Sequence, residues 1–262
     1  MRNFYAIYRK ELGHYFVSPV AYVVIGVFLF LSALFFNYFL SYLIMMQQRA
    51  AFQSLQMGMP PSMDVPSQVM GATFNLFSTF ILFFIPLLTM GVYAEERKRG
   101  TMELLMTSPV TELQIVLAKF FSVLTLFALM VLPSAAYLAY MFAHSDPAAP
   151  WKLLLVGYLG VVLLGGAFIA LGTFISSLTE NQLIASVITF AAFLFVWVIN
   201  LLSSNTDGPW ANVLQFLSVI KHYDDMARGV IDSSGVIYYV SFIVFFIFLT
   251  VRSVDSMRWR RA

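Results

Sequence analysis

The sequence predicts an all-α protein with six membrane-spanning helices, and three observations support this fold class. Hydrophobic residues make up 60% of the 262 residues and charged residues only 11%, whereas a soluble domain carries about 25% charged residues. The apolar residues also gather into six runs of the roughly 20 residues that a bilayer requires. Most charged residues lie between these runs. A soluble core could not hide this much apolar surface, because too few polar residues remain to cover it.

Residues 1–18 precede the first run and predict an amphipathic helix that lies in the membrane interface. Phe4, Tyr8, Leu12 and Tyr15 recur at helical spacing, as in such helices. The charged residues on its other faces are Arg2, Arg9, Lys10 and Glu11. The alternative is a charged flank that only orients the first span. That span is too long for a signal-peptide core, so we expect it to be retained.

Six apolar runs are predicted to span the membrane, at residues 20–46, 74–94, 120–143, 153–178, 183–203 and 236–251. They form a single membrane domain over residues 1–262, without a separate soluble domain. Pro86 and Pro133 lie inside the second and third runs and are expected to kink them, because proline removes a backbone hydrogen bond. In the fourth run, Gly166 with Ala170 and Gly172 with Ser176 have the small-residue spacing of close helix contacts. Such contacts could lie within one subunit or between two.

The distribution of Lys and Arg predicts that both termini lie in the cytoplasm. With this orientation, eleven of the fifteen basic residues are cytoplasmic, as the positive-inside rule requires. The four basic residues on the outer side are Arg49, Lys152, Lys221 and Arg228. The cytoplasmic segments then include residues 95–119, which form the longest strongly polar interruption between two apolar runs.

Residues 95–119 predict two short helices separated by a break. After Gly100, apolar residues from Met102 onward indicate a helix, and Pro109 ends it because proline disfavours the α conformation of its predecessor. Thr111 is the expected N-cap of the next helix, with Gln114 at the capping-box spacing. A helix pair between two spans is suited to contact a partner outside the membrane.

Two segments are expected on the outer side. Residues 47–73 are predicted to form a loop, in which three prolines and one glycine of MGMPPSMDVPS at residues 57–67 discourage regular structure. Residues 204–235 are half apolar and predict a short helix that lies on, or dips into, the outer interface. The polar residues of the spans either line a substrate path or bond to neighbouring helices, and the second interpretation is favoured. They are Asn75, Ser78, Thr79 and Asn200.

The sequence predicts no catalytic residue and no metal site. A nucleotide-binding P-loop needs Gly directly before its Lys, but the five lysines follow Arg9, Arg97, Ala118, Trp151 and Ile220. The chain has no Cys, and its net charge of +2 does not favour nucleic acid. Two metal-binding alternatives are weaker than solvated loops or chance clusters. They are His222 with Asp224 and Asp225, and Met57 with Met59 and Met63.

The six runs as drawn also contain no ionisable residue. Transporters driven by ions or protons usually place such residues within the membrane. The energy for any work is therefore expected to arrive from a partner through a surface, and residues 95–119 are the most elaborate inner surface.

Three stretches resemble the permease subunits of type-2 ABC exporters. The first is AEERKRGTMELLMTSPVTELQIVLAKF at residues 94–120. YRKELGHYFVSPVAYV at residues 8–23 and LSVIKHYDDMARGVIDSSGVIYY at residues 217–239 are similar to the branch with gliding-motility-associated and nitrous-oxide-reductase-maturation permeases. The resemblance covers nearly the whole chain, and it is more specific for the permease class than for a substrate.

The resemblance implies a coupling helix that contacts an ATPase subunit. The positions concerned are Glu95, Glu96, Arg97, Gly100, Thr101, Met102, Glu103, Leu104 and Leu105. It also implies an interfacial helix carrying Arg9, Lys10 and Glu11, outer re-entrant helices at residues 210–229, and a location in the bacterial inner membrane. Two permease chains, identical or homologous, would assemble with two ATPase chains that bind ATP and Mg²⁺, so this chain would bind no cofactor.

Two functions are compatible with this assembly. In the first, ATP-driven motion exports a substrate, which the sequence leaves open among lipid, glycan, peptide and sulfur species. In the second, the same motion is transmitted to an outer or periplasmic partner and nothing crosses the membrane. A membrane enzyme is the third and weakest interpretation, because no credible catalytic site is present.

Overall fold

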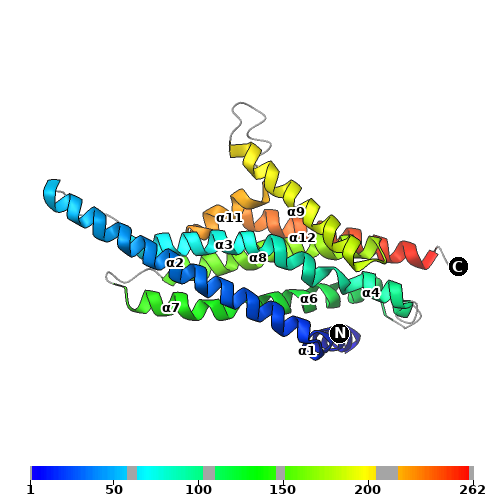
Figure 1. Cartoon of the computed structure of the whole chain (residues 1–262). Coiled ribbons are helices and arrows are strands. Elements are labelled where there is room, and N and C mark those ends of the chain that lie inside the picture. Colours follow the sequence, from blue (N-terminus) through cyan, green and yellow to red (C-terminus); the bar gives the residue numbers. More distant parts are fainter. Residues whose placement is uncertain (1, 58–63, 103–109, 146–150, 205–217, 260–262) are drawn as a thin grey trace.

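The computed structural model describes residues 2–57, 64–102, 110–145, 151–204 and 218–259, and these ranges are helical with short connections (Figure 1). Six helices or helix pairs in these ranges are long and apolar enough to cross a membrane, which confirms the predicted fold class. The elements are α1 (Arg2–Val17), α2 (Pro19–Met57), α3 (Val65–Thr89), α4 (Gly91–Arg99), α6 (Glu112–Val131), η1 (Leu132–Ser134), α7 (Ala135–Ala143), α8 (Trp151–Leu178), α9 (Gln182–Ser204), α11 (Val219–Ala227) and α12 (Ser233–Trp259).

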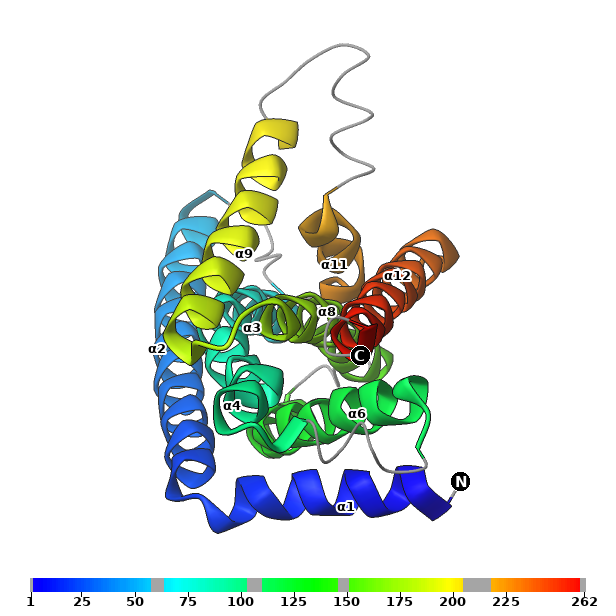
Figure 2. The ribbon, with the colours of Figure 1, turned by 90° about the vertical axis from the view of Figure 1, so that its right-hand side faces the viewer.

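Helix α8 lies at the centre of the bundle, with α3, α6, α11 and α12 around it (Figure 2). Its glycines allow this close packing. A Cβ atom at Gly157 would lie 2.1 Å from the Phe74 ring, and one at Gly165 would lie 2.2 Å from the Phe127 ring. At the positions left open by the sequence, a Cβ atom at Gly172 would lie 2.4 Å from Thr89 Oγ1 and one at Gly166 would lie 3.2 Å from Ile243 Cδ1, so these small residues pack inside one chain.

Helix α2 is much longer than predicted. Its 39 residues extend about 58 Å at roughly 1.5 Å per residue, whereas the apolar part of a bilayer is about 30 Å thick. The bounds of the predicted loop at 47–73 are wrong, because α2 continues to Met57 and α3 begins at Val65. The Asp64 side chain caps α3 by accepting a hydrogen bond from Ser67 N at 3.4 Å. Residues 58–63 lie outside the described part of the chain.

The two prolines have different effects on the spans. Pro133 lies in the 3₁₀ turn η1, which separates α6 from α7, as expected for a disturbed span. Pro86 instead lies inside α3, which continues to Thr89. The helix is interrupted at Met90, and α4 then extends the second span to Arg99, beyond its predicted end at residue 94.

Helix α1 packs against α6 (Figure 2). The Phe4 and Phe121 rings are 6.4 Å apart in an edge-to-face arrangement, and the Tyr8 hydroxyl lies 2.9 Å from Thr125 Oγ1. The N-terminal helix is thus confirmed, and its location in the membrane interface stays a prediction.

A short helix, α11, lies before the last span, within the range 210–229 where the resemblance implies outer helices. It begins at Val219, so it is not the helix that the apolar residues from Trp210 to Ile220 predicted. The Tyr223 hydroxyl donates to the Phe74 carbonyl at 2.6 Å, and Ser218 Oγ donates to Asn200 Oδ1 at 2.8 Å. These bonds join α11 to α3 and α9. The part of the predicted outer helices at 205–217 lies outside the described residues.

Polar residues of the second span bond within their own helix. Asn75 Nδ2 donates to the Gly71 carbonyl at 3.0 Å, and Ser78 and Thr79 both donate to the Asn75 carbonyl. Together with the bond between Ser218 and Asn200, these contacts agree with the structural interpretation of the four polar residues.

Candidate functional site

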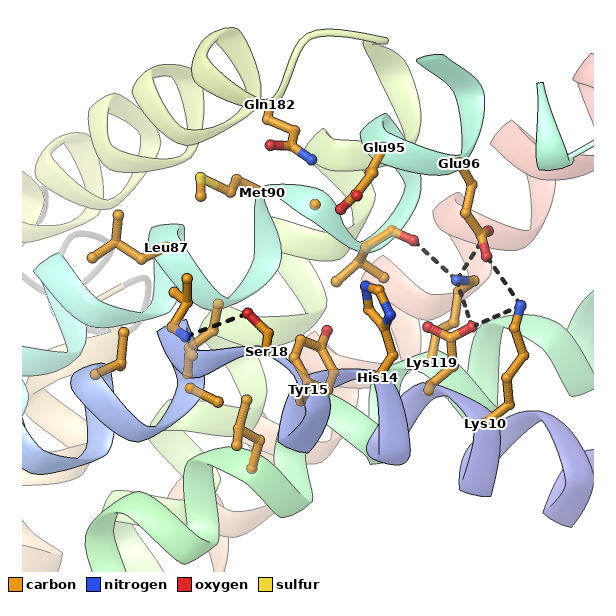
Figure 3. A pocket seen from close by; sticks show the side chains of 18 of the residues that line it. Lys10, His14, Tyr15, Ser18, Leu87, Met90, Glu95, Glu96, Lys119 and Gln182 are labelled. Atoms are coloured by element: carbon orange, nitrogen blue, oxygen red, sulfur yellow. Dashed lines mark hydrogen bonds and ion pairs between the residues drawn. The ribbon is translucent and has the colours of Figure 1, made fainter. Parts of the chain in front are cut away.

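Lys119 is a buried cation at the junction of α1, α4 and α6 (Figure 3). Only 1% of its side chain is exposed. Its Nζ atom lies 3.0 Å from Glu96 Oε2 and 3.2 Å from Glu11 Oε1, and it donates a hydrogen bond to the Val92 carbonyl at 3.0 Å. One cation therefore joins carboxylates from two other helices, and the three residues are called the Lys119 junction below.

The local sequence explains how these three side chains meet. Glu11 shares the face of α1 that carries Tyr8 and Tyr15, and this face packs on α6. Lys119 lies in the second turn of α6, where its ammonium group is 5.4 Å from the centre of the Tyr93 ring. A buried lysine is costly unless paired, so the two carboxylates are required for this packing.

Three further ion pairs lie around the Lys119 junction. Lys10 Nζ lies 3.8 Å from an oxygen of Glu11 and of Glu96, with 63% of its side chain exposed. Arg99 pairs with Glu95 one helical turn away. Exposed pairs of this kind contribute little to stability, so Lys119 dominates the electrostatics of the junction.

The interruption at Met90 is held by Ser176 of α8. Ser176 Oγ accepts hydrogen bonds from Tyr93 N at 3.2 Å and Ala94 N at 3.3 Å, and it donates to the Met90 carbonyl at 3.0 Å. A hydroxyl can accept two hydrogen bonds and donate one. Ser176 thereby satisfies backbone groups that the helix break leaves free, and it ties α4 to the central helix.

Arg97 makes a second connection from α4 to the end of α8. Its Nη1 donates to the Ser177 carbonyl at 2.8 Å, and its Nη2 lies 3.2 Å from Glu180 Oε1 in the turn before α9. Arg97 is therefore engaged inside the chain. A contact between Arg97 and a separate ATPase subunit stays a prediction.

The chain leaves α4 through a left-handed glycine. Gly100 has φ 71° and forms the C-cap of α4, a conformation that glycine adopts without steric cost. Thr101 is exposed, whereas Met102 is 4% exposed and belongs to the core. Glu103, Leu104 and Leu105, the remaining residues of the predicted coupling helix, lie outside the described part of the chain.

The predicted start of the next helix is confirmed. The Thr111 side chain accepts a hydrogen bond from Gln114 N at 3.4 Å, and α6 begins at Glu112. Lys119 follows two turns after this start and is buried inside α6. The cap at Thr111 predicted that Lys119 is helical, but not that Glu11 and Glu96 are its partners. The location of Lys119 on the cytoplasmic side stays a prediction.

A cavity of about 440 Å³ lies beside the Lys119 junction, between α1 and α4 (Figure 3). Tyr15 is part of its wall. Burial, followed by the charge of Glu11, raises the pKa of the Tyr15 hydroxyl well above its ordinary value, so this group stays neutral. The cavity also contacts the start of α2 and the end of α3, which places it where the N-terminal helix meets the first two spans.

Comparisons with known proteins were made for the whole chain. The family model described as "ABC-2 family transporter protein" matches residues 5–254, which is nearly the full length. The comparison with curated proteins found no match.

Proposed function

Because the chain belongs to the ABC-2 family of transporter proteins, we propose that it is a permease subunit that exports a substrate with energy from a separate ATPase subunit. Permeases of this family lack ATPase domains and in general act with an ATPase partner. The observation that carries the proposal is the attachment of α4 to α1, α6 and α8, through the ion pairs of Glu96 and the hydrogen bonds of Arg97 and Ser176. The segment after α4 is the expected contact with the ATPase.

Motion applied to residues 100–111 would pass into the bundle along two routes. The first runs from Glu96 through Lys119 to Glu11, and therefore from α4 into α6 and α1. The second runs through Arg97 and Ser176 into α8. Since α8 packs against most of the other spans, displacement of α4 would tilt the central helix and reshape the path between the spans.

The proposed assembly contains two permease chains, identical or homologous, and two ATPase chains that bind ATP and Mg²⁺. Residues 95–105 would face the ATPase, with Leu104 and Leu105 in the buried contact, since apolar anchors usually dominate such interfaces. Both termini would be cytoplasmic, in the inner membrane of a bacterium. α1, α4, the start of α6 and the end of α12 lie at the same end of the bundle, which supports a common side for the two termini and the segment after α4 (Figure 1).

The test uses the purified membrane complex. Leu104→Asp and Glu103→Arg should leave membrane insertion intact but abolish capture of the ATPase subunit and its stimulated ATP turnover. Phe52→Asp is the control, because Phe52 is exposed near the opposite end of the bundle, and it should leave both readouts unchanged. Normal complex formation in the two inner variants would overturn the proposal.

A second candidate function is transmission of motion to an outer partner, as the resemblance to gliding-motility permeases suggested. The extension of α2 favours it, because a 39-residue helix reaches well beyond the apolar thickness of a bilayer. Reconstitution with the ATPase separates the two functions. Substrate flux tied to ATP turnover supports export, whereas turnover that depends on an added outer protein supports transmission.

A further inference from the structure

The cavity beside the Lys119 junction has a charged side and an apolar side. Lys10, Glu96 and Lys119 lie at one side, and Leu87 lies at the other (Figure 3). Its volume of about 440 Å³ falls within the roughly 300–1,000 Å³ of small-molecule sites. It is too small for a whole phospholipid but suited to a head group with the first methylenes of its chains.

With α1 in its predicted location in the membrane interface, the cavity would lie at the boundary between head groups and acyl chains. It lies where the amphipathic helix α1 ends and the first span begins at Pro19. Val20 and Leu87 contribute to its wall and are 62% and 50% exposed. The apolar side of the cavity is therefore continuous with the surface that faces lipid, and an amphiphile could enter from within the bilayer.

The charges around the cavity balance. The charged residues of its wall are Glu11, Glu95, Glu96, Lys10, Arg99 and Lys119. Lys119 is buried between Glu11 and Glu96. The pairs of Arg99 with Glu95 and of Lys10 with Glu11 and Glu96 are partly exposed, and exposed pairs of this kind contribute little, so Glu95 and Lys10 can exchange their partners for those of a ligand. A purely anionic head group would find no excess of positive charge. A zwitterionic head group would find a carboxylate and an exposed ammonium group within one cavity.

We propose that this cavity binds the head group of a membrane phospholipid that carries a primary amine. Its ammonium group is held by Glu95, its phosphate faces Lys10, and its chains lie along Val20 and Leu87. The bound lipid contacts both α1 and α4 and stabilises their packing. This inference concerns the chain itself and does not depend on the proposed export function or on an ATPase partner.

The experiment measures lipid binding to the purified, delipidated full chain by native mass spectrometry. Phosphatidylethanolamine is compared with phosphatidylglycerol, which has a phosphate but no amine. Ala21 is 5% exposed and is part of the cavity wall, so Ala21→Phe should fill the cavity and weaken phosphatidylethanolamine binding at least tenfold. Ala191→Phe makes the same change at an exposed position on α9 and should leave binding unchanged.

Glu95→Gln provides a second test that keeps the cavity volume. It should abolish the preference for phosphatidylethanolamine over phosphatidylglycerol while the chain stays folded. The proposal is overturned if Ala21→Phe binds the lipid as the unmodified chain does, if phosphatidylglycerol binds equally well to the unmodified chain, or if Glu95→Gln keeps the preference.

Discussion

Replacement of Lys119 by Met removes a buried cation and leaves two carboxylates close together. At about 3 Å and an effective dielectric constant of about 20, each ion pair contributes roughly 5 kcal/mol of attraction. Desolvation of the three charges costs several kcal/mol for each ion and offsets most of this gain. The intact Lys119 junction is therefore nearly neutral for stability, whereas its disruption is not. Lys119→Met should lower the free energy of unfolding by about 3–5 kcal/mol.

The assay is unfolding of the purified chain in mixed detergent micelles with increasing sodium dodecyl sulfate, followed by tryptophan fluorescence. Lys152→Met makes the same change at an exposed position and should alter stability by less than about 0.5 kcal/mol. The triple variant Glu11→Gln, Glu96→Gln, Lys119→Met leaves no uncompensated buried charge, since Lys10 is 63% exposed, and should recover most of the lost stability. The expected role of Lys119 is refuted if the free energy of unfolding of Lys119→Met lies within about 1 kcal/mol of that of the unmodified chain. It is also refuted if the triple variant is no more stable than Lys119→Met.

Three other predictions use unfolding of the same purified chain. Gly165→Ala should lower the free energy of unfolding by about 1–3 kcal/mol, because its Cβ would lie 2.2 Å from the Phe127 ring. Gly26→Ala has free space and should raise the free energy of unfolding by about 0.5–1 kcal/mol. Equal changes in the two variants would contradict this packing. Gly100→Ala should lower the free energy of unfolding by about 1–2 kcal/mol, because Gly100 has a positive φ. An unchanged midpoint of the unfolding transition would exclude that conformation. Burial raises the pKa of the Asp224 carboxyl, so the folded state holds this proton more tightly and stability falls as the pH rises through the raised pKa. Asp224→Asn should therefore melt at a higher temperature than the unmodified chain at neutral pH. This difference in melting temperature should vanish at about pH 4, near the ordinary pKa of Asp. A difference that does not change with pH would contradict the raised pKa of Asp224.

The spans and helix ends could be predicted because their signals are local. Apolar length identifies each span, and the cap at Thr111 needs only a partner three residues away. The extension of α2 was not predicted, because the prolines that follow it indicate a loop. The segment from residue 47 to Met57 is rich in Gln and Ala and contains neither Gly nor Pro, a composition that favours helix, and this preference could have been recognised.

The Lys119 junction could not be predicted because its contacts are not local. Glu11 and Glu96 belong to other helices, and a single sequence does not show which carboxylates approach a given lysine. The same is true of Ser176, whose hydroxyl binds backbone groups around Met90 in a different span. Small residues in the fourth span predicted a close helix contact, but not the ring that each glycine faces.

In the proposed function, a separate ATPase acts on the segment between α4 and α6. The chain has no Cys, so Leu104→Cys introduces a single thiol for cross-linking in native membranes. We expect a cross-linked product of this variant with an ATPase subunit, and none for Phe52→Cys. Absence of an ATPase product for Leu104→Cys, together with labelling of that thiol by an impermeant maleimide added from the outer side, would contradict it.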